Sequence, residues 1–158
     1  MIAVLATPYT LDAQAEEPPG VEELLAQGRF EEALPTLVRL EQEWSREVHD
    51  NDTKETRLNW ALSLQGRGSA EARLQQFDAA LDHLRHARDL AVEGQFGPEF
   101  LAGILDELGR TEGKAGSYEE AGQSLLQAIE QHRKLDPVDR EPWLSASQNH
   151  LGLVYLTT

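Results

Sequence analysis

Apolar residues follow a helical period in three places along this chain. In each place an aromatic residue is followed by a small residue, then by Leu, then by a second small or aliphatic residue. The three copies are Phe30-Ala33-Leu37-Leu40, Phe77-Ala80-Leu84-Ala87 and Tyr118-Ala121-Leu125-Ala128. Because an α-helix turns once every 3.6 residues, this spacing puts the four side chains on one helix face. The pattern predicts three amphipathic helices that bury the same kind of face.

The three copies recur at a nearly constant distance. Phe30 and Phe77 are 47 residues apart, and Phe77 and Tyr118 are 41 apart. A second marker has the same period, because Gly68, Gly109 and Gly152 follow one another at intervals of 41 and 43 residues. A pattern that returns every few tens of residues is typical of stacked helical repeats. We therefore expect an all-α fold built from pairs of antiparallel helices.

Turn-forming residues separate the predicted helices. Glu16-Glu-Pro-Pro-Gly20 marks a break before the first helix, and Asp136-Pro137 ends a later one, because the residue before Pro avoids the helical region. Asp52 and Glu55 have the spacing of a capping box at the start of the third helix. The third helix is expected to run from about Lys54 to Gln76, because no Pro or other strong breaker interrupts this stretch. The predicted helices span about residues 21–28, 30–48, 54–76, 77–93, 99–115, 118–135 and 143–158.

Composition narrows the range of functions. The 158 residues include 28 acidic and 14 basic side chains, so the formal net charge is −14. This charge disfavours nucleic acid and anionic membranes as partners, because both require clustered Lys and Arg. The chain has no Cys, which excludes disulfides and thiolate chemistry. No apolar run is long enough to predict a membrane span.

Residues 1–19 are predicted to form a tail outside the helical region of residues 20–158. The segment Met1 to Pro8 is apolar, and Ala13-Gln-Ala15 resembles a signal-peptidase site, but the first basic residue is Arg29. The tail is thus either the remnant of a secretory signal or an ordinary terminus. The compartment stays open between the cytoplasm and export from a bacterial cell.

Two segments carry a resemblance to a known family. Gly28-Arg-Phe30-Glu-Glu-Ala33-Leu-Pro35 and Gly116-Ser-Tyr118-Glu-Glu-Ala121 resemble the tetratricopeptide repeat, in which a Gly two positions before an aromatic turns helix A into helix B. Leu108-Gly109 and Leu151-Gly152 match the Leu-Gly step of helix A. The spacing of forty-odd residues resembles the longer kinesin-light-chain subtype. HEAT and armadillo repeats share the period but lack this turn.

The resemblance implies a right-handed superhelical array of about three and a half repeats. The second repeat departs from the pattern, since Gln75 replaces the turn Gly and Arg67 replaces the Leu before Gly68. The last repeat has helix A but no helix B before Thr158. We expect either that the natural chain continues or that this apolar end docks on something, with self-association through the last helix as one form of docking.

Few residues indicate chemistry. His83 and His86 are three positions apart without further ligands nearby, and we expect the five His side chains to be solvated rather than metal-bound. Asp106 and Glu107 are adjacent, so they point apart on a helix and do not form a catalytic pair. No metal, cofactor or catalytic residue is expected. Core packing is the main expectation for the three tryptophans, with a binding role as the alternative: Trp44, Trp60 and Trp143.

The predicted function is a scaffold that binds a protein or peptide and has no catalytic activity of its own. By family register, helix A of each repeat lines a concave groove that holds Asp106, Arg110, Lys114 and Asn149. Arg110 and Lys114 form a cationic spot on an acidic protein. Asp106 and Arg110 replace the Lys and Asn of the family's carboxylate clamp, so chaperone-tail binding is not expected. The alternative is a regulatory arm of a larger effector enzyme or sensor, such as a caspase-like CHAT protease.

Overall fold

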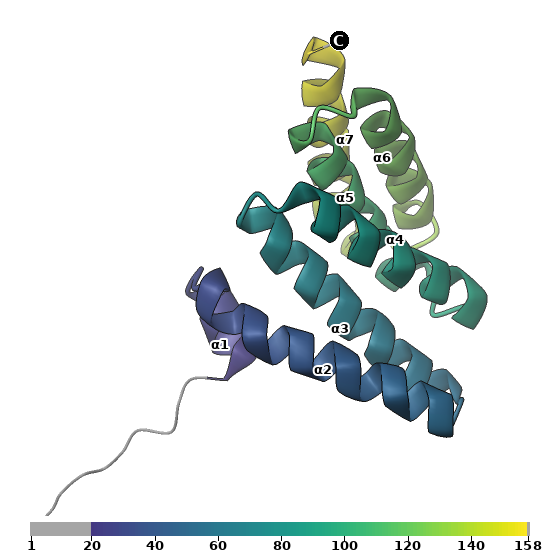
Figure 1. The fold of residues 1–158 in the computed structure, drawn as a ribbon. Helices are drawn as coiled ribbons and strands as arrows, with labels where there is room; N and C mark the ends of the chain where they lie inside the picture. Colours follow the sequence, from purple (N-terminus) through teal and green to yellow (C-terminus); the bar gives the residue numbers. More distant parts are fainter. Residues whose placement is uncertain (1–19, 158) are drawn as a thin grey trace, which may run out of the picture.

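The fold is all-α. The structure, a computed structural model, describes residues 20–157 and all of their side chains except those of residues 139 and 140. Within this range the backbone forms seven helices and no strand (Figure 1). Their bounds are α1 Val21–Ala26, α2 Phe30–Asp50, α3 Lys54–Arg73, α4 Phe77–Gly94, α5 Pro98–Lys114, α6 Tyr118–His132 and α7 Pro137–Thr157. The predictions for residues 1–19 and for Thr158 lie outside the described residues.

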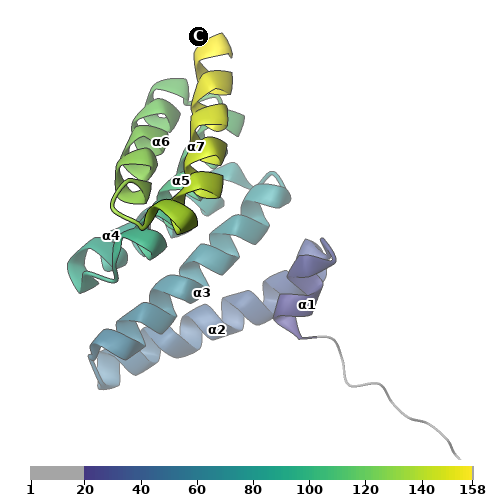
Figure 2. The ribbon, with the colours of Figure 1, turned by 180° about the vertical axis from the view of Figure 1, so that it is seen from behind.

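Each helix packs against the next one in the chain. The largest contacts join α3 to α4 and α5 to α6, and further contacts join α1 to α2, α2 to α3, α4 to α5 and α6 to α7. The helices follow one another from α1 at one end to α7 at the other (Figure 1). In addition α3 contacts α5, and α5 contacts α7. These three helices therefore form one layer, in which α7 lies toward the viewer in Figure 2.

Two glycines let paired helices approach closely. A Cβ added to Gly109 in α5 would lie 2.7 Å from Leu125 Cγ and 3.1 Å from the carbonyl oxygen of Ala121, both in α6. Gly68 in α3 has the corresponding neighbours in α4 at 2.8 and 3.1 Å, namely Leu84 and Ala80. The small residue and the Leu of the sequence pattern thus face the Gly of the preceding helix in both pairs. This explains why both markers share one period.

The turns inside the helix pairs have one backbone geometry. Gly28, Gln75 and Gly116 all lie in the left-handed region, with φ of 73°, 62° and 86°. After each of them an N–H donates to a carbonyl five residues earlier, as in Ser117 to Glu112 at 2.9 Å. This pattern is a Schellman motif, which normally requires Gly at the left-handed position. Gln75 therefore adopts the same turn as the glycines, at a conformational cost.

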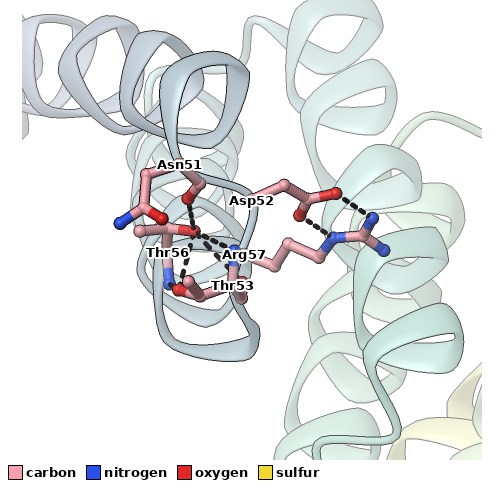
Figure 3. A network of polar contacts seen from close by, with 5 residues as sticks. All are labelled: Asn51, Asp52, Thr53, Thr56 and Arg57. Carbon is pink, nitrogen blue, oxygen red and sulfur yellow. Dashed lines mark hydrogen bonds and ion pairs between the residues drawn. The ribbon is translucent and has the colours of Figure 1, made fainter.

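The turn between α2 and α3 corrects one prediction. The capping box is formed by Thr53 and Thr56, not by Asp52 and Glu55. The Thr53 hydroxyl accepts the Thr56 N–H at 3.1 Å, and the Thr56 hydroxyl accepts the Thr53 N–H at 3.0 Å (Figure 3). Asp52 instead pairs through both oxygens with Arg57, with Oδ2 2.6 Å from Nη2. This guanidinium lowers the pKa of Asp52.

The last helix starts earlier than predicted. α7 begins at Pro137 and contains Pro142, whereas the sequence placed its start at Trp143. Pro137 lies in the first turn, where its missing N–H is not needed. Pro142 is the sixth residue of α7, as Pro35 is the sixth of α2, so both helices tolerate Pro close to their first turn. The predicted end of α6 at about Leu135, just before Asp136-Pro137, is three residues too late, because α6 ends at His132.

The core is made mainly of Leu and Ala, with buried carboxylates at equivalent positions. Leu64, Leu84, Ile104, Leu108 and Leu125 have almost no exposed surface. Glu71 and Glu112 are each 3% exposed and are 41 residues apart in the sequence. Each reaches across its helix pair: Glu71 Oε2 lies 2.7 Å from His83 Nδ1, and Glu112 Oε2 accepts the Ser124 hydroxyl at 2.7 Å.

Candidate functional site

The face of α5 toward α7 carries most of the predicted site. Asp106, Arg110 and Lys114 lie four residues apart in sequence on α5, so they follow one face of the helix. Glu99 and Gly103 continue this stripe toward the start of α5. Two surface hollows open along it. Arg110 and Lys114 line the first, and Glu99 and Gly103 line the second.

The first hollow, which we call the cationic pocket, has a volume of about 380 Å³. Its basic rim consists of Arg110 and Lys114 from α5 and His150 from α7. Its other walls come from α5, α6 and α7: Gly109, Gly113, Tyr118, Leu125, Leu153, Val154 and Thr157. A volume of this size lies at the lower end of about 300–1,000 Å³, the range of ligand-binding pockets. Two cationic side chains and a histidine thus surround an apolar floor.

Positive charge in the pocket is incompletely compensated. Burial lowers the pKa of Arg110, and the nearby Arg73 lowers it further. Burial, Arg73 and Arg110 lower the pKa of Lys114 in the same way. Burial lowers the pKa of His150 most, and the positive charges of Arg110 and Lys114 lower it further, whereas Asp106 raises it. All three cationic forms would be stabilised by an added anion.

Two polar atoms at the pocket have no partner among the described residues. Arg110 forms an ion pair with Glu107 one turn earlier, yet its Nε is buried without a hydrogen bond. Nδ1 of His150 is buried without a hydrogen bond as well. Buried donors and acceptors are normally satisfied, and those that are not call for a ligand or water. Both atoms belong to residues that line the cationic pocket.

Asp106 has a structural position between three helices. Its Oδ2 lies 2.7 Å from Nε2 of His132 in α6, and its Oδ1 accepts the Ser147 hydroxyl of α7 at 2.6 Å. Ser147 is fully buried and His132 is 3% exposed. Asp106 therefore ties α5 to α6 and α7. It was predicted to line the groove, but both of its oxygens are engaged by these two side chains.

The four predicted site residues are thus only partly brought together. Arg110 and Lys114 share the cationic pocket, Asp106 lies beside it within electrostatic reach of Arg110, and the exposed Asn149 on α7 is not among the residues that line it. Sequence reasoning missed His150, which no motif indicated. It also missed Arg73 on α3, although Arg73 and Lys114 are 41 residues apart and so obey the repeat period.

The second hollow, which we call the apolar pocket, has a volume of about 510 Å³. It lies between α3, α5 and α7, and the end of α6 closes it. Its lining is mostly Leu and aromatic residues: Leu58, Leu62, Gln65, Phe96, Glu99, Phe100, Gly103, His132, Leu135 and Trp143. Two of them are largely exposed although apolar, namely Leu62 at 47% and Trp143 at 59%. This hollow could hold an apolar side chain of a partner.

The other candidates from the sequence have mainly structural positions. Trp60 packs on the core and donates from Nε1 to Glu41 at 3.2 Å. The expectation of solvated histidines is wrong for His132, which is buried, and for His83, which pairs with Glu71. In the part of the chain that the structure describes, no three His, Asp or Glu side chains are placed to hold a metal ion, and no helix is long and apolar enough to cross a membrane.

Comparison of the sequence with protein-family models gives no match, and comparison with curated proteins gives none either. The resemblance to the tetratricopeptide family therefore rests on the residues of this chain.

Proposed function

We propose that this chain is a protein-binding module of tetratricopeptide type, with three helix pairs and α7 as the first helix of a fourth. The partner segment binds across α3, α5 and α7, and the module catalyses no reaction on it. The observation that carries this proposal is the cationic pocket beside the apolar pocket on the same face of a protein with net charge −14. The recognised segment combines carboxylates with at least one apolar side chain.

Helix packing supports the repeat assignment. Gly68 and Gly109 meet the same residue types at almost the same distances, and Gly28, Gln75 and Gly116 form the same turn. The alternate helices α3, α5 and α7 contact one another, as expected where the first helices of successive pairs line one side of a stack. These features repeat with the period of the aromatics in the sequence.

Local charge supports an acidic partner. The negative charge on the rest of the protein repels acidic segments. The cationic pocket therefore favours binding of such a segment there over binding elsewhere on the surface. Arg73 and Lys114 also lie in the last turns of their helices, where a positive charge is favourable for the helix itself. This benefit does not account for Arg110, which is more buried and lies one turn earlier.

Spacing between the pockets defines the partner further. Gly103 lines the apolar pocket and Arg110 the cationic pocket, and seven residues of α-helix span about 10 Å. A helical partner would therefore place an apolar side chain and a carboxylate about seven residues apart. An extended partner would cover the same distance in about three residues.

A peptide-binding experiment tests this arrangement. Labelled peptides with Leu or Trp at one position and Glu pairs at either spacing are titrated with the intact protein, and fluorescence anisotropy is measured. We expect Glu→Gln in the best peptide to weaken binding about tenfold to a hundredfold, since a charge-assisted contact contributes roughly 1.5–3 kcal/mol. The combined change Arg110→Glu and Lys114→Glu should remove binding, and added salt should weaken it.

Matched charge reversal on another helix provides the control. Arg39→Glu with Arg46→Glu changes the net charge by the same amount on α2, where both residues are exposed. This variant should bind with the affinity of the natural protein. Equal loss of binding in both double variants would show that only the net charge matters. Undiminished binding after the α5 reversal would reject the site.

A further inference from the structure

We propose that the outward face of α7 is an interface between two copies of this chain. The face consists of Ser145, Gln148, Gly152 and Leu156, which are all exposed and recur at helical spacing. Leu156 is 85% exposed. The two copies of α7 cross at Gly152 about a two-fold axis. This proposal does not depend on the proposed function, because the four residues lie on the side of α7 opposite to the residues that contact α5 and α6.

Equivalent faces of the other helices show that this kind of surface is normally covered. In α5 the corresponding residues, 43 positions earlier, are Ala102, Leu105, Gly109 and Gly113; the first three are buried and Gly113 is partly buried. There Leu125 of α6 lies against Gly109. At Gly152 an added Cβ would meet nothing within 4 Å among the described residues. Gly152 therefore leaves an open notch on α7, whereas α4 and α6 cover the corresponding glycines, Gly68 and Gly109.

Charge indicates what covers this face. The sequence from Pro142 to Thr158 contains no Asp, Glu, Lys or Arg, which is its longest uncharged stretch. Two copies that each carry a net charge of −14 repel one another over most of their surface. Contact through the uncharged part of α7 keeps the acidic surfaces apart, and Gln148 can pair with its counterpart across the axis. An oppositely charged partner would find no Asp, Glu, Lys or Arg to match between residues 142 and 157 of α7.

The dimension of the face sets the expected affinity. α7 has 21 residues and is about 31 Å long. One face of a single helix is smaller than the roughly 800 Å² per partner of a standard interface. We therefore expect a reversible dimer with a dissociation constant in the micromolar range rather than an obligate one.

Sedimentation velocity of the full chain over a range of concentrations tests the proposal. We expect a concentration-dependent shift from monomer to dimer that salt strengthens, because salt screens the repulsion between the acidic surfaces. Leu156→Glu and Gly152→Glu should each give a monomer. Leu126→Glu is the control, since Leu126 is an exposed leucine of α6 at 49%. Its dimerisation should equal that of the natural chain.

A cross-link locates the interface. Because the chain has no cysteine, Gly152→Cys introduces a unique thiol in open space. Oxidation should convert this variant to a disulfide-linked dimer, whereas Leu126→Cys should stay largely monomeric. Circular dichroism of every variant establishes that the helices are intact. A chain that is monomeric at the highest concentration, or dimers that Leu126→Glu weakens as much as Leu156→Glu does, would overturn the proposal.

Discussion

The same substitution should have opposite effects at two equivalent glycines. Gly109→Ala places a Cβ 2.7 Å from Leu125 Cγ and 3.1 Å from a backbone carbonyl of α6, whereas Gly152→Ala places one in open space. Both glycines lie inside helices, and neither has a positive φ. Any difference between the two variants therefore reports on the contact between α5 and α6 and not on the backbone.

Two opposing contributions determine the magnitude. Ala is favoured over Gly inside a helix by about 0.8–1.0 kcal/mol. At Gly109 overpacking costs roughly 1–3 kcal/mol, because the carbonyl oxygen of Ala121 cannot move without distorting α6. We expect Gly109→Ala to lower the free energy of unfolding by about 1 kcal/mol. Gly152→Ala should raise it by roughly 0.5–1 kcal/mol.

Thermal unfolding followed by circular dichroism measures both effects. For a chain of this length about 1 kcal/mol corresponds to 2–4 °C in Tm. Both variants are compared at low protein concentration, so that association through α7 does not contribute. Gly68→Ala should resemble Gly109→Ala, because its Cβ would lie 2.8 Å from Leu84 Cγ. An increase in Tm for Gly109→Ala equal to that for Gly152→Ala would refute the close approach of α5 and α6.

Three further predictions concern single residues. Gln75→Gly should raise the free energy of unfolding by about 0.5–1 kcal/mol, because Gly adopts φ of 62° without strain. Gln76→Gly, at a position with negative φ, should not stabilise the protein, and urea unfolding distinguishes the two variants. Thr53→Ala should lower it by about 1 kcal/mol through loss of the cap, and Thr53→Ser should retain most of the stability. Burial and Arg110 lower the pKa of His150, so unfolding takes up a proton between the folded and unfolded pKa values. Stability should fall as the pH drops through this window, His150→Gln should remove that dependence, and an NMR titration should show the pKa of His150 rising when an acidic peptide binds.

Helix positions and turns could be predicted from the sequence because they depend on local patterns. The period of Phe30, Phe77 and Tyr118 predicted the second helix of each pair, and the all-α fold is confirmed. The predicted details that the structure contradicts depend on competition between neighbouring side chains for the same partner. Asp52 has the spacing of a capping residue, but Arg57 holds it in an ion pair and Thr53 caps the helix instead.

Contacts between distant residues explain why the candidate site was only partly predicted. Arg110 and Lys114 share a pocket because four residues separate them on α5. Asp106 lies on the same stripe, but its hydrogen bonds go to His132 and Ser147, 26 and 41 residues away. No local pattern encodes such a network. Its formation depends on where α6 and α7 come to lie.

Packing between successive helices has a consequence for how this chain folds. Since each helix contacts mainly the helices next to it, most contacts join residues close in sequence, and the contact order is low. Such chains nucleate locally and grow outward, which favours rapid folding. Opening should start at the ends, with the six-residue α1 exchanging its amide hydrogens first and the central α3, α4 and α5 last. A partner that spans α3, α5 and α7 would slow exchange most at the α7 end.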